Sequence, residues 1–379
     1  MTQYPRSKWL LIPVLFLISS QAWCWGDLGH SIVGAVAEER MKPETKAFVE
    51  GVLGIEPMAF TATWADAVRS DERFNHDASN YDQSIKDKDN NNFSDYHFAD
   101  VPTGYTYDNK PVKDLKDAFG GISGAITVLK APSKHFPRAA KIIALRYLIH
   151  LIGDIHQPLH VGNGYDIGAN FCSVFLGASK FPTNLHSVWD GPMVQELGKT
   201  LVDPKDPQSK PALYYDNYIA AFKKYRASKF NQAKPQDVSL TAIKGWIDES
   251  AAIRETTVYP DDPQTMVGVP NTEKYKHRAY CMWLADKKKN IFGDTSARSK
   301  ADIPVAAMPK IDAAYISKNM PVVEDQLINA GVRLAAVLDD IAASVAQSEH
   351  PPRTVPASLE EKILNSMQSL FHNNETANP

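Results

Sequence analysis

The stretch that most constrains this chain is residues 141–160, KIIALRYLIHLIGDIHQPLH. Its apolar residues recur near a helical period, which predicts a helix buried over much of its surface. Pro158 cannot continue this helix, so the chain turns there and presents His160 just beyond the helix end. His150 and Asp154 are four residues apart and therefore project from the same side of the helix.

An imidazole and a carboxylate on one side of an apolar helix are costly to bury without a partner. A zinc ion is one such partner, because it takes nitrogen and oxygen ligands from side chains. The alternative is a core histidine satisfied by the local acid, and His150 and Asp154 alone leave both interpretations open. His186 and Asp190 repeat the same spacing in a stretch rich in Gly and Asn, where the backbone can approach a ligand closely.

Residues 1–24 differ in character from the rest of the chain. Two basic residues precede an apolar run at 9–18, and Ala22 and Cys24 occupy the minus-three and minus-one positions of a cut before Trp25. The run is too short to span a membrane and is typical of a cleaved secretory signal, with a retained membrane anchor as the alternative. Cleavage would place His30 five residues from a free amine, which could chelate a metal together with the first carbonyl.

The charge balance argues against a protein that binds nucleic acid through a basic surface. The 379 residues are 44% hydrophobic and 22% charged, as in a soluble globular protein. Removing residues 1–24 takes Arg6 and Lys8 from the 41 basic residues and nothing from the 44 acidic ones, which leaves a net charge of −5. Lys and Arg that neutralise phosphate normally make such a domain basic. An anionic substrate would therefore have to meet some other cation.

Two cysteines, Cys172 and Cys281, remain after cleavage. Export makes a disulfide between them plausible, and two separate buried thiols are the alternative. The sequence contains no CxxC pattern, so a zinc site built from cysteines is not expected.

The remaining patterns predict an all-α fold with a single mostly helical domain. Asp27 is placed to cap the first helix, and no strand-rich alternation, long repeat or Gly-rich phosphate loop stands out. Further helices are expected at Pro43–Leu53, 112–131, 186–190, Val238–Val258 and Val322–Ala343. Residues 201–235 are interpreted as a polar crossover. The domain is expected to span residues 25–346 and to be followed by a loosely ordered tail at 347–379.

Other candidate residues are weaker when each is considered alone. Asp66 and Arg69 have the spacing of a surface helix with solvated charges. His97, Phe98 and Asp100 end a polar stretch and have no partner pattern of their own. His156 is expected to be structural or solvated, because it would lie on the opposite side of the helix from Asp154.

Together these residues carry a resemblance to a known family. The matching segments are WGDLGH (25–30), WADAVR (64–69), HFAD (97–100), HLIGDIHQPLH (150–160), GYDIGAN (164–170) and NLHSVWD (184–190). In this order they resemble the zinc-dependent single-strand-specific nucleases and 3′-nucleotidases of fungi and plants. That family shares its fold with bacterial zinc phospholipase C. The resemblance covers about residues 25–346.

The resemblance implies three zinc ions in a helical cleft. The first zinc would be held by Asp66, His97, His150 and Asp154. The second would be held by His160, His186 and Asp190. The third would be held by the amine and carbonyl of Trp25, with His30 and Asp154. Asp154 would then bridge two metals, and a close metal pair can both polarise a nucleophile and clamp a phosphate.

The resemblance also implies the activity. Single-stranded RNA and DNA would be cleaved to 5′-nucleotides, and 3′-nucleotides would lose their phosphate. Arg69 and Asn170 would contact the phosphate, Phe98 would stack on a base and Asp100 would bond its edge. The protein is expected to be a secreted or periplasmic monomer. Ala169 departs from the family, which often has Gly at that position, and its methyl group could narrow the approach to the backbone.

Two rival functions remain. A zinc phospholipase C would act on lipid head groups, but that branch has Glu where this chain has Asp190, and HFAD suits a base pocket. A non-enzymatic exported zinc-binding protein would take up zinc without hydrolysing phosphate esters. Pure metal storage needs neither Arg69, Phe98 nor Asn170.

Overall fold

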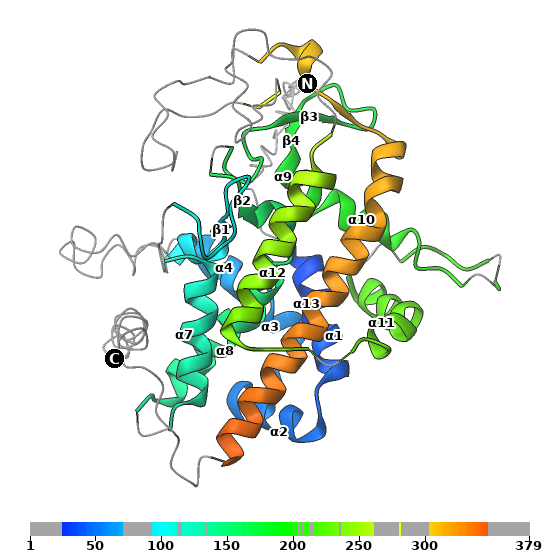
Figure 1. The fold of residues 1–379 in the computed structure, drawn as a ribbon. Helices are drawn as coiled ribbons and strands as arrows, with labels where there is room; N and C mark the ends of the chain where they lie inside the picture. The colour runs from blue at the N-terminus through cyan, green and yellow to red at the C-terminus, as the bar shows by residue number, and fades with distance from the viewer. Residues whose placement is uncertain are drawn as a thin grey trace, which may run out of the picture.

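The computed structural model describes residues 25–70, 93–111, 116–132, 135–164, 166–203, 205–206, 208–212, 215–234, 236–260, 280–281 and 303–347. The predicted signal peptide and residues 348–379 of the predicted tail lie outside these residues. The fold prediction is confirmed, since the described chain is mostly helical (Figure 1).

The helices are α1 Asp27–Arg40, α2 Pro43–Leu53, α3 Met58–Thr61, α4 Trp64–Ser70, α7 Ala118–Lys130, α8 Arg138–Asp154, α9 Leu185–Asp190, α10 Pro192–Gly198, α11 Tyr215–Asn231, α12 Leu240–Ile253 and α13 Ala313–Gln347. Short 3-10 turns occur at η1 Phe93–His97, η2 Pro158–His160 and η5 Val305–Ala307, and α12 continues into a π-helical turn, η3 Arg254–Val258.

Two small sheets supplement the helices. β1 (Ala99–Asp100) pairs in parallel with β2 (Val161–Gly162), which places the segment after η1 beside the segment after η2. β3 (Ser173–Leu176) pairs antiparallel with β4 (Thr183–Asn184) and parallel with β5 (Lys310–Ile311). These ladders are two to four residues long, too short to produce a visible alternation in the sequence.

The core forms where α1, α7 and α8 meet the long helix α13 (Figure 1). α1 approaches α13 very closely at Gly331, where a Cβ would lie 2.5 Å from Val36 Cβ. α7 and α8 pack along each other on one side of α13, and α11 lies on the other side. The two helices that begin and end the described chain therefore hold each other in place.

Several helix predictions are confirmed. α2 occupies the predicted residues, and α8 ends at Asp154, ahead of Pro158. The pattern at Val238–Val258 forms α12 and η3. The pattern at Val322–Ala343 lies within α13, which begins earlier and carries Pro321 inside it.

The interpretation of residues 201–235 as a polar crossover is wrong. The second half of this segment forms α11, which buries Tyr218, Phe222 and Phe230. The first two are four residues apart and the third follows eight residues later, so they share a helix face that the three preceding prolines obscured. α7 begins at Ala118 rather than at residue 112, because the Asp117 carboxylate accepts a hydrogen bond from Gly120 N and caps the helix there.

The predicted cap at Asp27 is also wrong. α1 begins at Asp27 itself, and the preceding Gly26 provides no side-chain cap. The acid instead occupies the first turn of the helix, where a carboxylate interacts favourably with the helix dipole.

The disulfide is confirmed, since Cys172 and Cys281 are bonded to each other. The bond joins the start of β3 to a segment 109 residues further along the chain. None of the helices in the described residues combines the length and the apolar character needed to cross a membrane.

Candidate metal centre

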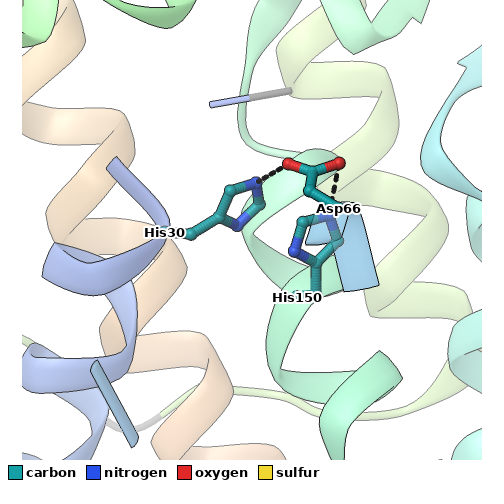
Figure 2. Close-up of side chains that lie close together, drawn as sticks. All are labelled: His30, Asp66 and His150. Atoms are coloured by element: carbon teal, nitrogen blue, oxygen red, sulfur yellow. Dashed lines mark ion pairs between the residues drawn. The ribbon is translucent and has the colours of Figure 1, made fainter. Parts of the chain in front are cut away.

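Three helices and one 3-10 turn deliver side chains to a common buried centre. α1 provides His30, α4 provides Asp66, η1 provides His97, and α8 provides His150 and Asp154. All five are almost completely buried. Figure 2 shows His30 and His150 approaching the two oxygens of Asp66 from opposite helices.

His97 and His150 form the first group with the two acids. His97 Nδ1 lies 3.5 Å from Asp66 Oδ1 and 3.3 Å from Asp154 Oδ2. His150 Nε2 lies 3.7 Å from Asp66 Oδ1 and 3.1 Å from Asp154 Oδ2. Asp66, expected from its spacing alone to be a solvated helix residue, is therefore an interior residue facing two imidazoles.

His30 borders this group on the other side. Its Nε2 lies 4.0 Å from Asp66 Oδ2 and 3.5 Å from Asp154 Oδ1, and its ring stacks on His150 with the centroids 3.8 Å apart. Gly153 of α8 makes room for it, because a Cβ there would lie 2.8 Å from His30 Nδ1. The His30 ring thus fits only against a glycine.

The second group joins η2 to α9. His186 Nε2 lies 3.2 Å from Asp190 Oδ2, and His160 Nε2 lies 3.4 Å from Asp190 Oδ1. The two rings stack with the centroids 5.0 Å apart. The repeated four-residue spacing therefore brings His186 and Asp190 together on one helix, as the sequence predicted.

Asp154 connects the two groups. Its Oδ1 accepts a 2.9 Å hydrogen bond from His160 Nδ1, while its Oδ2 faces His97 and His150. Oδ1 also lies 3.5 Å from His30 Nε2. The two oxygens therefore face His30 on one side and His97 and His150 on the other, which is the arrangement of a bridging metal ligand.

Backbone carbonyls orient two of the imidazoles. His150 Nδ1 donates to Ala62 O over 2.7 Å, and His186 Nδ1 donates to Gly168 O over 2.6 Å. This tautomer leaves the Nε2 lone pair of each ring facing the carboxylates, as in metal-binding histidines whose other nitrogen is hydrogen bonded.

The pKa values of several groups in the centre are shifted, because carboxylates and imidazoles lie close together in the interior. Burial lowers the pKa of His30 to about 4, and His150 adds to this effect. Burial also lowers the pKa of His160, but the Asp154 carboxylate outweighs it and raises that pKa to about 9. Burial likewise opposes ionisation of Asp154, yet His150 and His160 hold its pKa well below the ordinary value. The carboxylate is therefore ionised in a site that needs positive charge.

The donor set fits metal ions. Within the described residues, buried polar atoms of the centre that have no hydrogen-bond partner include both ring nitrogens of His30, His160 Nε2, Asp154 Oδ2 and Asp190 Oδ2. Such atoms cost free energy unless something coordinates them. Three groups, His30–Asp66–His150, His97–His150–Asp154 and His160–His186–Asp190, each converge closely enough to hold one ion. A fourth group, Asp166–Cys172–Cys281, offers no thiolate because its cysteines form the disulfide.

Trp25 lies beside the second group. Its side chain is fully buried, and the N–H of the next residue, Gly26, donates to Asp190 O over 2.8 Å. The chain at the predicted cleavage point therefore reaches the backbone of one metal-ligating candidate, and α1 carries His30 from there into the first group.

Two of the predicted substrate residues, Phe98 and Asp100, lie in the segment that follows His97. Phe98 follows His97 directly and is 41% exposed, the exposure of an accessible aromatic ring. Burial raises the pKa of Asp100, and Gly162 lies so close that a Cβ there would meet Asp100 Oδ1 at 2.3 Å. The side chain of Arg69 lies outside the described side chains, although its backbone belongs to α4.

Asn170 ends a tight turn on which the second group depends. Gly168, Ala169 and Ile167 all have positive φ, at 56°, 63° and 52°. Ala169, the departure from the family pattern, thus has a left-handed conformation that glycine adopts more easily. The turn presents Gly168 O to His186, and Asn170 Nδ2 donates to Ile167 O.

Sequence reasoning missed two residues that support the centre. Gln157 Nε2 donates to Asp190 Oδ1 over 2.7 Å, and Asp166 accepts from Ala169 N over 2.8 Å to hold the turn. Nothing in their spacing distinguishes them from ordinary polar residues. His156 is buried and accepts from Arg333 Nη1 over 2.9 Å, in keeping with the structural role expected for it.

With this geometry in place, the class of protein follows from comparison with known families. A sequence profile of the S1/P1 nuclease family matches residues 25–343, and the chain belongs to this family of nucleases. The match begins at Trp25 and ends within α13, so it includes every residue of the metal centre.

Individual relatives share low sequence identity with this chain, but the similarity extends over most of its length. Nuclease S1 of Aspergillus oryzae is 25% identical over 332 residues, which cover 84% of this chain and 92% of the relative. Endonuclease 3 of Arabidopsis thaliana is 24% identical and covers 88% and 94% of the two chains. Nuclease P1 of Penicillium citrinum is 28% identical and covers 62% and 82%.

Proposed function

We propose that this nuclease is a zinc-dependent hydrolase that cleaves single-stranded RNA and DNA to 5′-nucleotides and also removes phosphate from 3′-nucleotides. The observation that carries the proposal is the position of Asp154, which has one oxygen facing His30 and the other facing His97 and His150. Two linked metal groups are the arrangement that in-line phosphoryl displacement needs.

Three zinc ions are proposed, with the ligands expected from the resemblance. Asp66, His97, His150 and Asp154 would hold the first ion, His160, His186 and Asp190 the second, and Trp25, His30 and Asp154 the third. The convergence of each group and its unpaired buried atoms support the first two sets. The third also requires a free amine at Trp25, and the hydrogen bond from Gly26 N to Asp190 O keeps that residue nearby.

Bound zinc would supply an activated water and a Lewis acid for the phosphate oxygens. The chain's own residues would do the rest. Asp154 would fix the two groups relative to each other, and the hydrogen bonds to Ala62 O and Gly168 O would hold the His150 and His186 rings in register. Arg69 would bind a non-bridging phosphate oxygen, and Asn170 would contact the phosphate from the turn.

The preference for single strands would come from Phe98. An accessible ring beside the centre can stack only on a base that is not already stacked in a duplex, and such stacking tolerates any base sequence. Asp100, whose pKa burial raises, would contribute a hydrogen bond to the base edge.

The domain and location are proposed in the same way. Residues 25–346 would form one catalytic domain that is exported by a signal peptide ending at Cys24 and works as a monomer, either secreted or in the periplasm. The disulfide Cys172–Cys281 supports an oxidising compartment.

The direct test offers the purified protein single-stranded RNA, single-stranded DNA, duplex DNA, 3′-AMP and phosphatidylcholine side by side, with zinc present and after chelation. We expect hydrolysis of both single strands and of 3′-AMP, loss of all three activities on chelation and recovery with zinc. Hydrolysis of the lipid alone would reverse the assignment in favour of a phospholipase. Zinc uptake without any hydrolysis would indicate a metal-binding protein.

A further inference from the structure

Arg254 lies where α12 passes into the π-helical turn η3, and its side chain is completely buried. Its guanidinium group makes three hydrogen bonds. Nη1 donates to Val161 O, Nη2 donates to Val101 O over 2.8 Å, and Nε donates to Glu255 Oε1 over 2.9 Å. A buried cation is costly unless such acceptors surround it, and a planar fork fixes the positions of the groups that it binds. The arginine therefore holds two backbone carbonyls in fixed positions relative to each other.

The two carbonyls belong to the two sides of the ladder between β1 and β2. Val161 begins β2, and Val101 follows Asp100 at the end of β1. The ladder is two residues long, and Val101 N extends it by donating to Gly162 O over 2.9 Å. A two-stranded pair is marginally stable on its own. The fork of Arg254 therefore acts as a clamp across this ladder.

Both strands continue from candidate ligands of the metal centre. β1 begins two residues after His97, with Phe98 between them, and β2 directly follows His160. Asp100 of β1 lies against β2, because a Cβ on Gly162 would meet its Oδ1 at 2.3 Å. The register of the ladder therefore sets where the proposed base contacts, Phe98 and Asp100, lie relative to the first and the second metal group.

The face of α12 that carries Arg254 holds the preceding segment as well. α12 packs against η2 and β2 (Figure 1). Ser250 lies one turn before Arg254 on the same side of the helix, and its hydroxyl donates to Ile155 O over 2.6 Å, in the turn between α8 and η2. The π-helical turn begins at Arg254, and such turns are frequent at functional sites. α12 thus holds the chain between Asp154 and β2 at two points.

The charge of Arg254 also acts on one of the base contacts. Burial raises the pKa of Asp100, whereas the positive charges of Lys110 and Arg254 lower it. These two cations therefore favour the ionised carboxylate, which accepts hydrogen bonds from the N–H groups at the edge of a base.

We propose that Arg254 is a positioning residue for base recognition, which holds Phe98 and Asp100 in place by clamping β1 to β2. The inference rests on the proposed function, in which these two residues contact the base. A residue with this role affects substrates that carry a base more strongly than substrates without one. A residue that serves only folding affects both kinds of substrate alike.

The test gives the zinc-loaded full chain two substrates, 3′-AMP and methyl β-D-ribofuranoside 3-phosphate, in which a methoxy group replaces the base. The wild type is expected to prefer 3′-AMP by about tenfold or more in kcat/KM, because stacking on one aromatic ring provides a preference of this order. Arg254→Lys keeps the positive charge but loses the planar fork. It should lower this preference by about fivefold, through a raised KM for 3′-AMP, while the zinc bound per chain stays the same.

Two further variants and one binding measurement complete the test. Arg333→Lys is the matched control, because Arg333 is also a buried arginine but bonds to His156 and Glu249 instead of the ladder, and it should keep the wild-type preference. Phe98→Ala should lose the preference, which verifies that the ratio reports on the base. Adenosine has no phosphate, and in equilibrium dialysis it should bind Arg254→Lys about fivefold more weakly than the wild type, a result that does not depend on turnover.

An unchanged preference in Arg254→Lys, an equal loss on both substrates, a loss of zinc or unchanged binding of adenosine would overturn the proposal. Arg254→Met keeps the length of the side chain without its donors and should lower the preference further. If Arg254→Met does not fold, Arg254→Lys decides alone. A wild type that hydrolyses neither substrate would instead contradict the proposed function.

Discussion

Single residues decide whether the metal centre can form, and some of them are not ligands. Gly153 contributes no donor atom, yet it lies between two candidate ligand residues of α8 and faces the His30 ring. Because the fit is this close, the His30 ring can lie where it does only if residue 153 of α8 has no side chain. The ligands and the space around them are equally part of the site.

Gly153→Ala is expected to displace His30. The added Cβ would lie 2.8 Å from His30 Nδ1, so the ring must move away from Asp66 and Asp154. We expect zinc bound per chain to fall by about one equivalent and nuclease activity to fall with it. Elemental analysis and single-strand hydrolysis measure both. Gly51→Ala in α2, where a Cβ meets nothing within 4 Å, is the matched control and should keep full zinc.

Asp154→Ala is expected to lower the zinc bound per chain by more than the loss of a ligand that belongs to only one group. Its Oδ1 faces His30 and its Oδ2 faces His97 and His150, so the first and the third ion would lose a ligand at once. His186→Ala, which touches only the second group, should lose one equivalent and is the comparison. Equal zinc loss in the two variants, by elemental analysis of folded protein, would argue against a bridging role.

At the scale of elements, the packing of the helices positions the candidate ligand residues. α1 brings His30 to the centre and packs against α13, while α8 provides two candidate ligands and packs against both. The sequence predicted α2 and the end of α8 correctly because proline positions and a regular apolar period determine them. The sequence did not predict α11, because lysines lie between the apolar residues Tyr218, Phe222 and Phe230 and three prolines precede them.

Gly331→Ala is expected to destabilise the protein by about 1–3 kcal/mol, the usual cost of an overpacked core. The new methyl group would lie 2.5 Å from Val36 Cβ and force α1 and α13 apart. Urea unfolding monitored by circular dichroism measures the change. Gly245→Ala in α12 adds the same methyl group where nothing lies within 4 Å, and should stabilise by about 0.5–1 kcal/mol through helix propensity. The same sign for both variants would contradict this packing.

The buried hydroxyl of Tyr218 predicts that the packing of α11 becomes less stable at alkaline pH. Burial raises the pKa of its hydroxyl above the ordinary value of 10, and the hydroxyl donates to Val194 O in α10. Because the folded-state pKa is raised, its contribution to stability is present below pH 10 and is lost as the pH rises above that value.

Tyr218→Phe should therefore lose about 1 kcal/mol at neutral pH, through the missing hydrogen bond, and show a shallower decline in the free energy of unfolding above pH 10. Parallel slopes for the two proteins in that range, from urea unfolding at several pH values, would contradict the assignment.

At the scale of the whole molecule, the sequence was sufficient to predict the helical class and to name the candidate ligands, because short sequence motifs indicate both. It could not show how segments distant along the chain come together. The ladder between β1 and β2 that places the His97 segment beside His160 is two residues long and leaves no pattern. Gln157 and Asp166 act through hydrogen bonds that depend on the tertiary fold, so no local spacing predicts them.

The net negative charge of the chain can also be explained at this scale. Three carboxylates, Asp66, Asp154 and Asp190, are buried together around five histidines. Cations held there would put positive charge at the centre of the molecule, where a phosphate backbone must approach, without any need for a basic surface.

The most direct test of this account is an anomalous difference map, recorded at the zinc absorption edge, from crystals of the mature protein beginning at Trp25. The account predicts three peaks, one within each ligand set, with Asp154 contacting two of them. A map without peaks among these histidines and aspartates, from protein that still cleaves single-stranded nucleic acid, would contradict it.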